Sequence, residues 1–143
     1  MNKAACLIAI DGSQPCLRAL EYAIQDAATR KEAPHIYLVN VQTALSSNVT
    51  RFIDGKTVED FHRDNGEESL AAAKERLGAT GLSSSSHVMV GEAAPSLVQF
   101  AQEKGCRLIV IGTHGFGTVL GLVMGSVATT VVHLSSLPVL LVK

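Results

Sequence analysis

The chain has 143 residues, of which 47% are hydrophobic and only 17% are charged, and its 12 Lys and Arg nearly balance its 13 Asp and Glu. This length predicts a single domain spanning residues 1–143. The near-zero net charge argues against nucleic acid as the main partner and against a polybasic membrane anchor.

The charges are unevenly distributed, because residues 108–142 contain no Asp, Glu, Lys or Arg. A membrane span needs about 20 mostly apolar residues in a row, and Gly, Ser, Thr, His and Pro residues interrupt this segment. The three cysteines, Cys6, Cys16 and Cys106, form no CxxC pair and no metal-ligand spacing. An odd, scattered set indicates reduced thiols. With no secretory signal visible, we expect a cytoplasmic protein that does not span the membrane.

Apolar and amphipathic segments alternate along the chain. Strands are predicted at residues 4–10, 35–41, 86–90, 108–111 and 138–142. Helices are predicted at residues 15–31, 57–77, 95–104 and 125–134. Residues 43–55 are expected to be irregular, and the serine run 83–86 is expected to be a loop. Strands that are apolar on both faces, alternating with helices, predict an α/β fold with one doubly wound, five-stranded parallel sheet covered on both faces.

Two further expectations concern side chains of the predicted helices and strands. The buried face of the helix at 57–77 is predicted from its apolar spacing to contain Val58, Phe61, Leu70, Ala73 and Leu77. The histidines at positions 35, 62 and 87 are scattered in the sequence, so no metal site is expected from them.

Ligands of doubly wound sheets bind beyond the carboxyl ends of the strands, where the strand order reverses. This rule directs attention to Asp11-Gly12-Ser13, to the end of the second strand at Val41, and to residues 112–117. Asp11 either caps the first helix or contacts a ligand, and Ser13 is a plausible N-cap. A Walker A loop is absent, and the single glycine after the first strand disfavours a dinucleotide-binding GxGxxG motif.

The fourth predicted strand leads into a glycine motif with the spacing G-x2-G-x9-G-S, formed by Gly112, Gly115, Gly125 and Ser126. Glycines permit positive φ and close approach of the backbone to a ligand. Successive backbone N–H groups in such a turn bind anions, and a helix beginning at Ser126 would offer further N–H groups and its positive dipole end. The motif therefore predicts two phosphate sites built without cationic side chains, with Ser126 also a candidate N-cap.

This constellation resembles the nucleotide-binding branch of the universal stress protein family. The resemblance covers nearly the whole chain, including residues 8–13, 39–41 and 138–142. It implies the adenine-nucleotide α-hydrolase-like fold with strand order 3-2-1-4-5. It also implies a regulatory protein that binds ATP or AMP, with Mg²⁺ carried on the phosphates where present, and a homodimer formed through residues 138–142, from Pro138 to Val142.

The resemblance assigns a role to each candidate residue. Around the adenine and ribose it places Ala9, Asp11 and Val41, with Ser13 beside them. Along the ribose and the first phosphates it places Gly112, His114, Gly115 and Phe116. At the distal phosphates it places Gly125, Ser126 and Val127.

The residues themselves leave alternatives open. Residues 118–124 are almost wholly apolar where similar proteins often carry Lys or Arg, which leaves AMP, ADP or a cyclic nucleotide in place of ATP. No Lys or Arg is placed to stabilise a phosphoryl transition state, so catalysis is poorly supported and a slow ATPase is a lesser alternative. The other alternative is a dimeric adaptor on the same fold that binds no nucleotide, with residues 118–124 as its contact surface.

Overall fold

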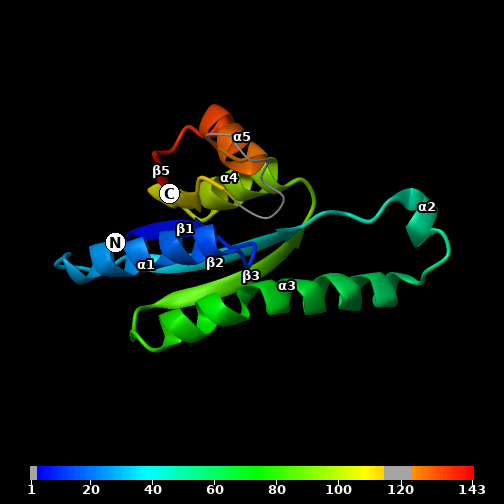
Figure 1. Cartoon of the computed structure of the whole chain (residues 1–143), viewed down its shortest axis with the longest axis horizontal. Coiled ribbons are helices and arrows are strands. Elements are labelled where there is room, and N and C mark those ends of the chain that lie inside the picture. The colour runs from blue at the N-terminus through cyan, green and yellow to red at the C-terminus, as the bar shows by residue number, and fades with distance from the viewer. Residues whose placement is uncertain (1–2, 115–123) are drawn as a thin grey trace.

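The computed structural model describes residues 3–114 and 124–143. Its five strands are β1 (Ala5–Ala9), β2 (His35–Gln42), β3 (Ser84–Val90), β4 (Leu108–Gly112) and β5 (Val139–Val142). Its helices are α1 (Gln14–Ala28), α2 (Ser47–Thr50), α3 (Gly55–Gly78), α4 (Ala93–Glu103) and α5 (Ser126–Leu134). All strand pairs are parallel, in the order β3-β2-β1-β4-β5, and helices cover both faces of the sheet (Figure 1). The predicted doubly wound sheet and its strand order are confirmed.

The central strand β1 is buried on both faces, which explains its unbroken apolar sequence. Cys6 and Ile8 face one core with α1 and α3, and Ala5 and Leu7 face the other core with α4 and α5. All three cysteines are buried and free, and the absence of a disulfide among them agrees with the reduced thiols predicted from the sequence. Burial raises the pKa of Cys6 to about 12 and that of Cys106 to about 11, so both thiols stay protonated at neutral pH.

The polar segment between β2 and α3 is not irregular throughout, as was predicted, because it contains the short helix α2. The Ser46 hydroxyl caps α2 by accepting a hydrogen bond from the Val49 N–H. Asp54 caps α3 in the same way, with its carboxylate 2.7 Å from the Thr57 nitrogen. Two polar residues of this segment, Ser46 and Asp54, are therefore helix N-caps. The first helix is also shorter than predicted, because α1 ends at Ala28 and not at residue 31.

The buried face of α3 differs from the predicted one. Its buried residues are His62, Gly66, Leu70, Ala73 and Leu77. Phe61, predicted to be buried, is 49% exposed. Gly66 explains which side of α3 faces the sheet. A Cβ at that position would meet both methyl groups of Val88 on β3, with Cγ2 only 2.5 Å away. The N-terminal half of α3 and α2 extend beyond the end of the sheet as an arm (Figure 1).

Two histidines that are far apart in sequence lie together on neighbouring strands. The serine run predicted to be a loop is largely part of β3. The Ser85 hydroxyl oxygen lies 3.1 Å from His35 Nε2 and 3.1 Å from His87 Nε2. The Tyr37 ring contacts both imidazoles, with centroids 4.6 Å from His35 and 5.8 Å from His87. Burial lowers the pKa of each imidazole, helped by Lys3 at His35 and by Lys104 at His87.

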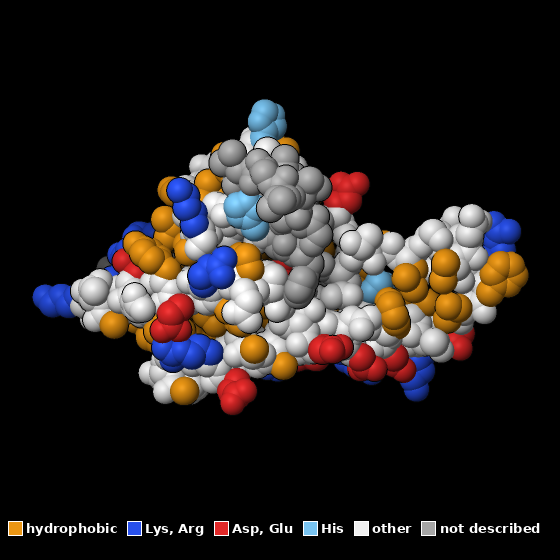
Figure 2. All heavy atoms as spheres, in the orientation of Figure 1, with side chains coloured by type: hydrophobic (Ala, Val, Ile, Leu, Met, Phe, Trp, Pro, Cys, Tyr) orange, Lys and Arg blue, Asp and Glu red, His pale blue; other side chains and the backbone are white. Residues whose placement is uncertain are grey.

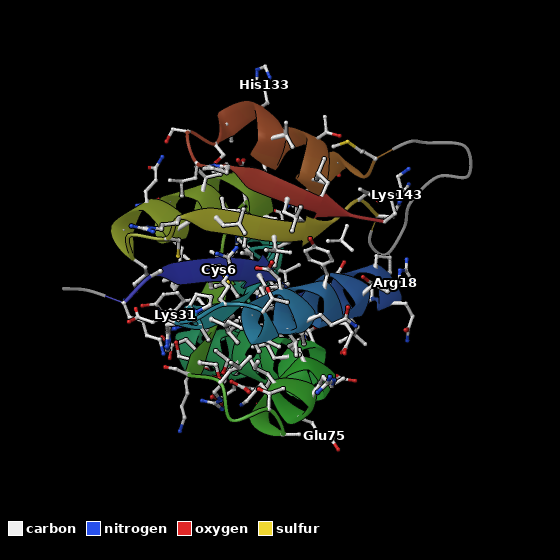
Figure 3. All side chains as sticks on the ribbon, turned by 90° about the vertical axis from the view of Figure 1, so that its left-hand side faces the viewer. Cys6, Arg18, Lys31, Glu75, His133 and Lys143 are labelled. Carbon is white, nitrogen blue, oxygen red and sulfur yellow. The ribbon has the colours of Figure 1, made fainter. Side chains whose placement is uncertain are left out.

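This pair predicts a pH dependence of stability. The pKa of each histidine is depressed in the folded state below the unfolded value of 6.5. The unfolded chain therefore takes up protons first, so stability is complete above that pH and is lost as the pH falls through the folded pKa values. We expect the urea concentration at the unfolding midpoint to decrease as the pH is lowered from about 7 to about 5. His87→Gln should reduce this dependence, whereas the same change at His133, which is exposed and points outward (Figure 3), should not; equal pH dependence in all three proteins would contradict the prediction.

Candidate functional site

The first part of the candidate site is the turn that follows β1. Gly12 takes a positive φ of 87°, which bends the chain from the strand into α1. The Asp11 carboxylate accepts hydrogen bonds from the Ser13 backbone N–H, at 2.9 Å, and from the Ser13 hydroxyl. Ser13 occupies the N-cap position as predicted, but its side chain makes no capping hydrogen bond because it bonds Asp11. The turn thus holds an exposed carboxylate at the carboxyl edge of the sheet.

A polar chain from β2 supports this turn. The buried Asn40 donates a hydrogen bond of 2.8 Å from its amide to the Ile10 carbonyl, immediately before Asp11. Gln42 in turn donates to the Asn40 side-chain oxygen at 2.7 Å. Val41, between them, is half-buried. Neither amide was singled out as a functional residue; the available signal was a pair of polar side chains in an otherwise apolar strand.

The sheet register brings the ends of the central strands to one edge. Ala9 pairs with Val39 of β2, and Ile8 pairs with Val110 of β4. Consequently Ala9, Val41 and Gly112 all lie at the carboxyl edge, as the fold rule requires.

The predicted positive φ is not what requires a glycine at position 112. Positive φ among the described residues occurs at Gly12, Gly81, Gly91 and Gly105, so Gly112 does not use a left-handed conformation. A Cβ at Gly112 would lie 2.9 Å from the Pro15 carbonyl oxygen and 3.0 Å from its carbon. The missing side chain lets the start of α1 pack directly on β4, whatever ligand binds nearby.

We therefore expect Gly112→Ala to destabilise the protein without nucleotide present. Backbone atoms of Pro15 cannot move aside without shifting α1, and overpacking of this kind costs about 1–3 kcal/mol. Urea unfolding measures this loss. Gly78→Ala is the matched control, because nothing lies within 4 Å of a Cβ there; equal stability of the two variants would contradict the packing explanation.

The residues after β4 connect it to α5. Thr113 is buried, donates its backbone N–H to Val142 of β5 at 2.9 Å, and accepts a hydrogen bond from the Gly125 N–H. Its hydroxyl lies 2.9 Å from His114 Nδ1. The Thr113–Gly125 bond places the beginning of α5 beside the end of β4. The predicted ligand residues Gly115 and Phe116, and most of residues 118–124, lie outside the described residues.

Helix α5 begins with exposed residues beside the end of β4. Gly125 is its N-cap, so Ser126 is the first helical residue and not the N-cap. Ser126 and Val127 are exposed, and the first turn contains no acidic residue. The first N–H groups of a helix lack intrahelical partners, and with the helix dipole they favour an anion.

The structure adds two cations that were not predicted. Lys143 follows β5 at the carboxyl edge, and its carbonyl accepts a 3.1 Å hydrogen bond from Arg18 Nε of α1. The two side chains lie on the same side of the molecule (Figure 3). Both cations therefore lie at the carboxyl edge of the sheet, although neither belongs to the glycine motif itself.

No group of three or more His, Cys, Asp or Glu in residues 3–114 and 124–143 is arranged to hold a metal ion. Within those same ranges, no helix is long and apolar enough to cross a membrane.

Comparisons with known proteins agree with this architecture. The sequence model of the Universal stress protein family matches residues 5–143. Universal stress protein YxiE of Bacillus subtilis is 31% identical over 145 residues, covering 96% of this chain and 97% of YxiE. A universal stress protein solved in complex with cAMP has a TM-score of 0.72 and 24% identity, covering 100% of this chain and 99% of its own. A family protein from Arabidopsis thaliana with AMP bound has a TM-score of 0.68 and 18% identity, covering 98% of this chain and 91% of its own.

The family match spans almost all of the chain, and the solved relatives share its fold over nearly their whole length. The chain belongs to the universal stress protein family.

Proposed function

We propose that this protein binds an adenine nucleotide at the carboxyl edge of β1 and β4 and acts as a regulatory component of a stress response. The observation that carries the proposal is the Thr113–Gly125 hydrogen bond, which joins the N-terminus of α5 to the end of β4. It brings an anion-favouring helix start to the edge where the Asp11 turn also lies. Two solved proteins of this fold, with AMP and with cAMP, support an adenine nucleotide as the ligand.

In this proposal each part of the site contacts a different part of the nucleotide. The exposed Asp11 carboxylate accepts hydrogen bonds from the ribose hydroxyls, and Ala9 and Val41 form the apolar wall for the adenine. The distal phosphates lie at the first turn of α5, near Ser126 and Val127. A nucleotide phosphate would carry any Mg²⁺, since Asp11 is the one carboxylate that this arrangement supplies.

Arg18 and Lys143 extend the range of ligands that the site favours. Residues 118–124 carry no cation, which by itself favours AMP over ATP. The two cations near the end of β5 add positive potential at the same edge, and this effect is long-range and screened by salt. We accordingly propose both AMP and ATP as ligands, with the ATP affinity falling more steeply as salt is added.

The edge strand β5 supports a second part of the proposal, a cytoplasmic homodimer. All four of its residues are half-buried in the single chain. An apolar edge strand presents unpaired backbone groups that another strand can cover. Pairing through residues 138–142 would remove this exposed edge.

Isothermal titration calorimetry tests the binding proposal. Titrations with ATP, AMP and cAMP should give a dissociation constant below about 1 mM for at least one of them, with GMP as the matched base control. Absence of binding to all three at that level would contradict the proposal and favour the adaptor alternative. Phosphate release measured in the same samples would reveal any slow ATPase activity.

A further inference from the structure

Buried polar side chains are concentrated around the candidate site. In the described part of the chain the buried polar residues are Ser13, Asn40, His62 and Thr113. All of them except His62 lie at the carboxyl edge of the sheet, whereas the surface of the arm gathers hydrophobic side chains (Figure 2). Burying an amide costs free energy unless its hydrogen bonds are made, and Asn is disfavoured in strands. Asn40, inside strand β2, is therefore a candidate for a role in the site.

Asn40 holds the peptide group between Ile10 and Asp11. Its amide donates to the Ile10 carbonyl at 2.8 Å, and the Ile10 N–H donates to the Val39 carbonyl at 2.9 Å. The register of β1 with β2 ends at the pair Ala9 and Val39, so the Asn40 side chain continues the contact between the strands beyond that pair. Because a peptide group is planar, fixing the Ile10 carbonyl also fixes the direction in which the chain enters Asp11.

Gln42 stabilises the orientation of the Asn40 amide. A backbone carbonyl can only accept a hydrogen bond, so Asn40 must turn its nitrogen toward Ile10 and its oxygen toward Gln42. Gln42 Nε2 donates to that oxygen at 2.7 Å. The reversed amide would place the Asn40 oxygen against the Ile10 carbonyl oxygen, which is unfavourable.

The Asp11 turn keeps one carboxylate oxygen for a ligand. The Ser13 N–H and the Ser13 hydroxyl both donate to Oδ1, and Oδ2 accepts no hydrogen bond from the described residues. The Ser13 carbonyl in turn accepts a hydrogen bond of 3.3 Å from the Leu17 N–H of α1. The turn is thus held on one side by Asn40 and on the other by α1, and both determine where Asp11 Oδ2 lies.

We propose that Asn40 is a positioning residue that directs Asp11 Oδ2 toward the ribose hydroxyls of the bound nucleotide, with Gln42 holding Asn40 in the required orientation. The inference rests on the proposed function. It adds a specificity, because this polar chain makes the site prefer a nucleotide that has ribose hydroxyls. An acceptor that is already in place need not be ordered when the ligand binds, and moving it weakens only the hydrogen bonds that it makes.

Isothermal titration calorimetry compares AMP with 2′,3′-dideoxy-AMP, which lacks both ribose hydroxyls. The wild type should bind AMP at least about tenfold more tightly, since a hydrogen bond to a charged group is stronger than one between neutral groups. Asn40→Leu, which preserves the size of the side chain, should lower this ratio at least about threefold by weakening AMP. Asp11→Ala should lower it as well. A merely structural role of Asn40 would weaken both ligands equally and leave the ratio unchanged.

Two variants of the half-buried Gln42 give a test that leaves the buried amide in place. In Gln42→Glu the carboxylate can only accept, so it favours the reversed Asn40 amide and should lower the ratio. In Gln42→Lys the ammonium can only donate, as Gln42 does to Asn40, and should preserve most of the discrimination. The added charges act on the phosphate of both ligands alike and cancel in the ratio.

The outcomes separate this inference from the proposed function. A ratio that falls in Asp11→Ala but stays unchanged in Asn40→Leu and Gln42→Glu would overturn the inference and leave the nucleotide site intact. Equal affinities of the wild type for the two ligands would also overturn it. Absence of AMP binding by the wild type would overturn the proposed function, and the inference with it. If Asn40→Leu does not fold, the two Gln42 variants decide.

Discussion

Ser126→Asp is expected to weaken adenine-nucleotide binding by at least about 100-fold while stabilising the protein. The new carboxylate would face the nucleotide phosphates at the first turn of α5. Like charges about 4 Å apart at a protein surface repel by several kcal/mol, which is enough for this loss of affinity. The same carboxylate interacts favourably with the helix dipole, and because α5 has no acidic residue in its first turn, a gain of about 0.3–1 kcal/mol is expected.

Ser126→Asn separates the charge from the loss of the hydroxyl. It is neutral and close in size to Asp, so its affinity should fall by about tenfold or less, the value of one hydrogen bond. Calorimetry gives the affinities and thermal unfolding gives the stabilities. If Ser126→Asp bound nucleotide as well as Ser126→Asn does, the phosphates would not lie at the start of α5.

Gly66→Ala should have the second large effect, a loss of up to about 2 kcal/mol in the free energy of unfolding. In most helices the change from Gly to Ala is favourable by about 1 kcal/mol. At Gly66 the new methyl group would meet the branched side chain of Val88, and overpacking of about 1–3 kcal/mol outweighs the gain.

Once the Val88 side chain is shortened, Gly66→Ala should stabilise the protein and no longer destabilise it. In a Val88→Ala background, Gly66→Ala should raise the free energy of unfolding by about 0.5–1 kcal/mol, because only the helix propensity remains. Urea unfolding of the four proteins in this cycle measures the coupling. An equal loss in both backgrounds would show that contact with Val88 is not what requires a glycine in α3.

The sheet could be predicted because its strands are buried on both faces and therefore have continuous apolar sequences. β1 and β4 are the clearest cases, and α1, α3 and α4 between them follow from their periodicity, whereas the short helix α2 does not. The buried face of α3 could not be predicted, since Phe61 is more apolar than His62 or Gly66. Shape at the contact with Val88, not hydrophobicity, determines which side of α3 faces the sheet.

The candidate site was predictable to a similar degree. Its positions at the strand ends follow from the parallel topology, which places Ala9, Val41 and Gly112 at one edge. The reason for Gly112 is a contact with Pro15 that sequence spacing does not reveal. The hydrogen bond from Arg18 Nε to the Lys143 carbonyl joins residues 125 positions apart, and only the folded chain brings them together.

The most direct test of the central claim is an amide NMR titration with AMP. Nucleotide bound at the carboxyl edge should shift the backbone signals of Asp11, Gly12, Thr113, Ser126 and Val127, while those of α3 and the arm stay in place. Shifts confined to the arm, or no shifts at millimolar AMP, would contradict the assignment of a nucleotide site to the ends of β1 and β4.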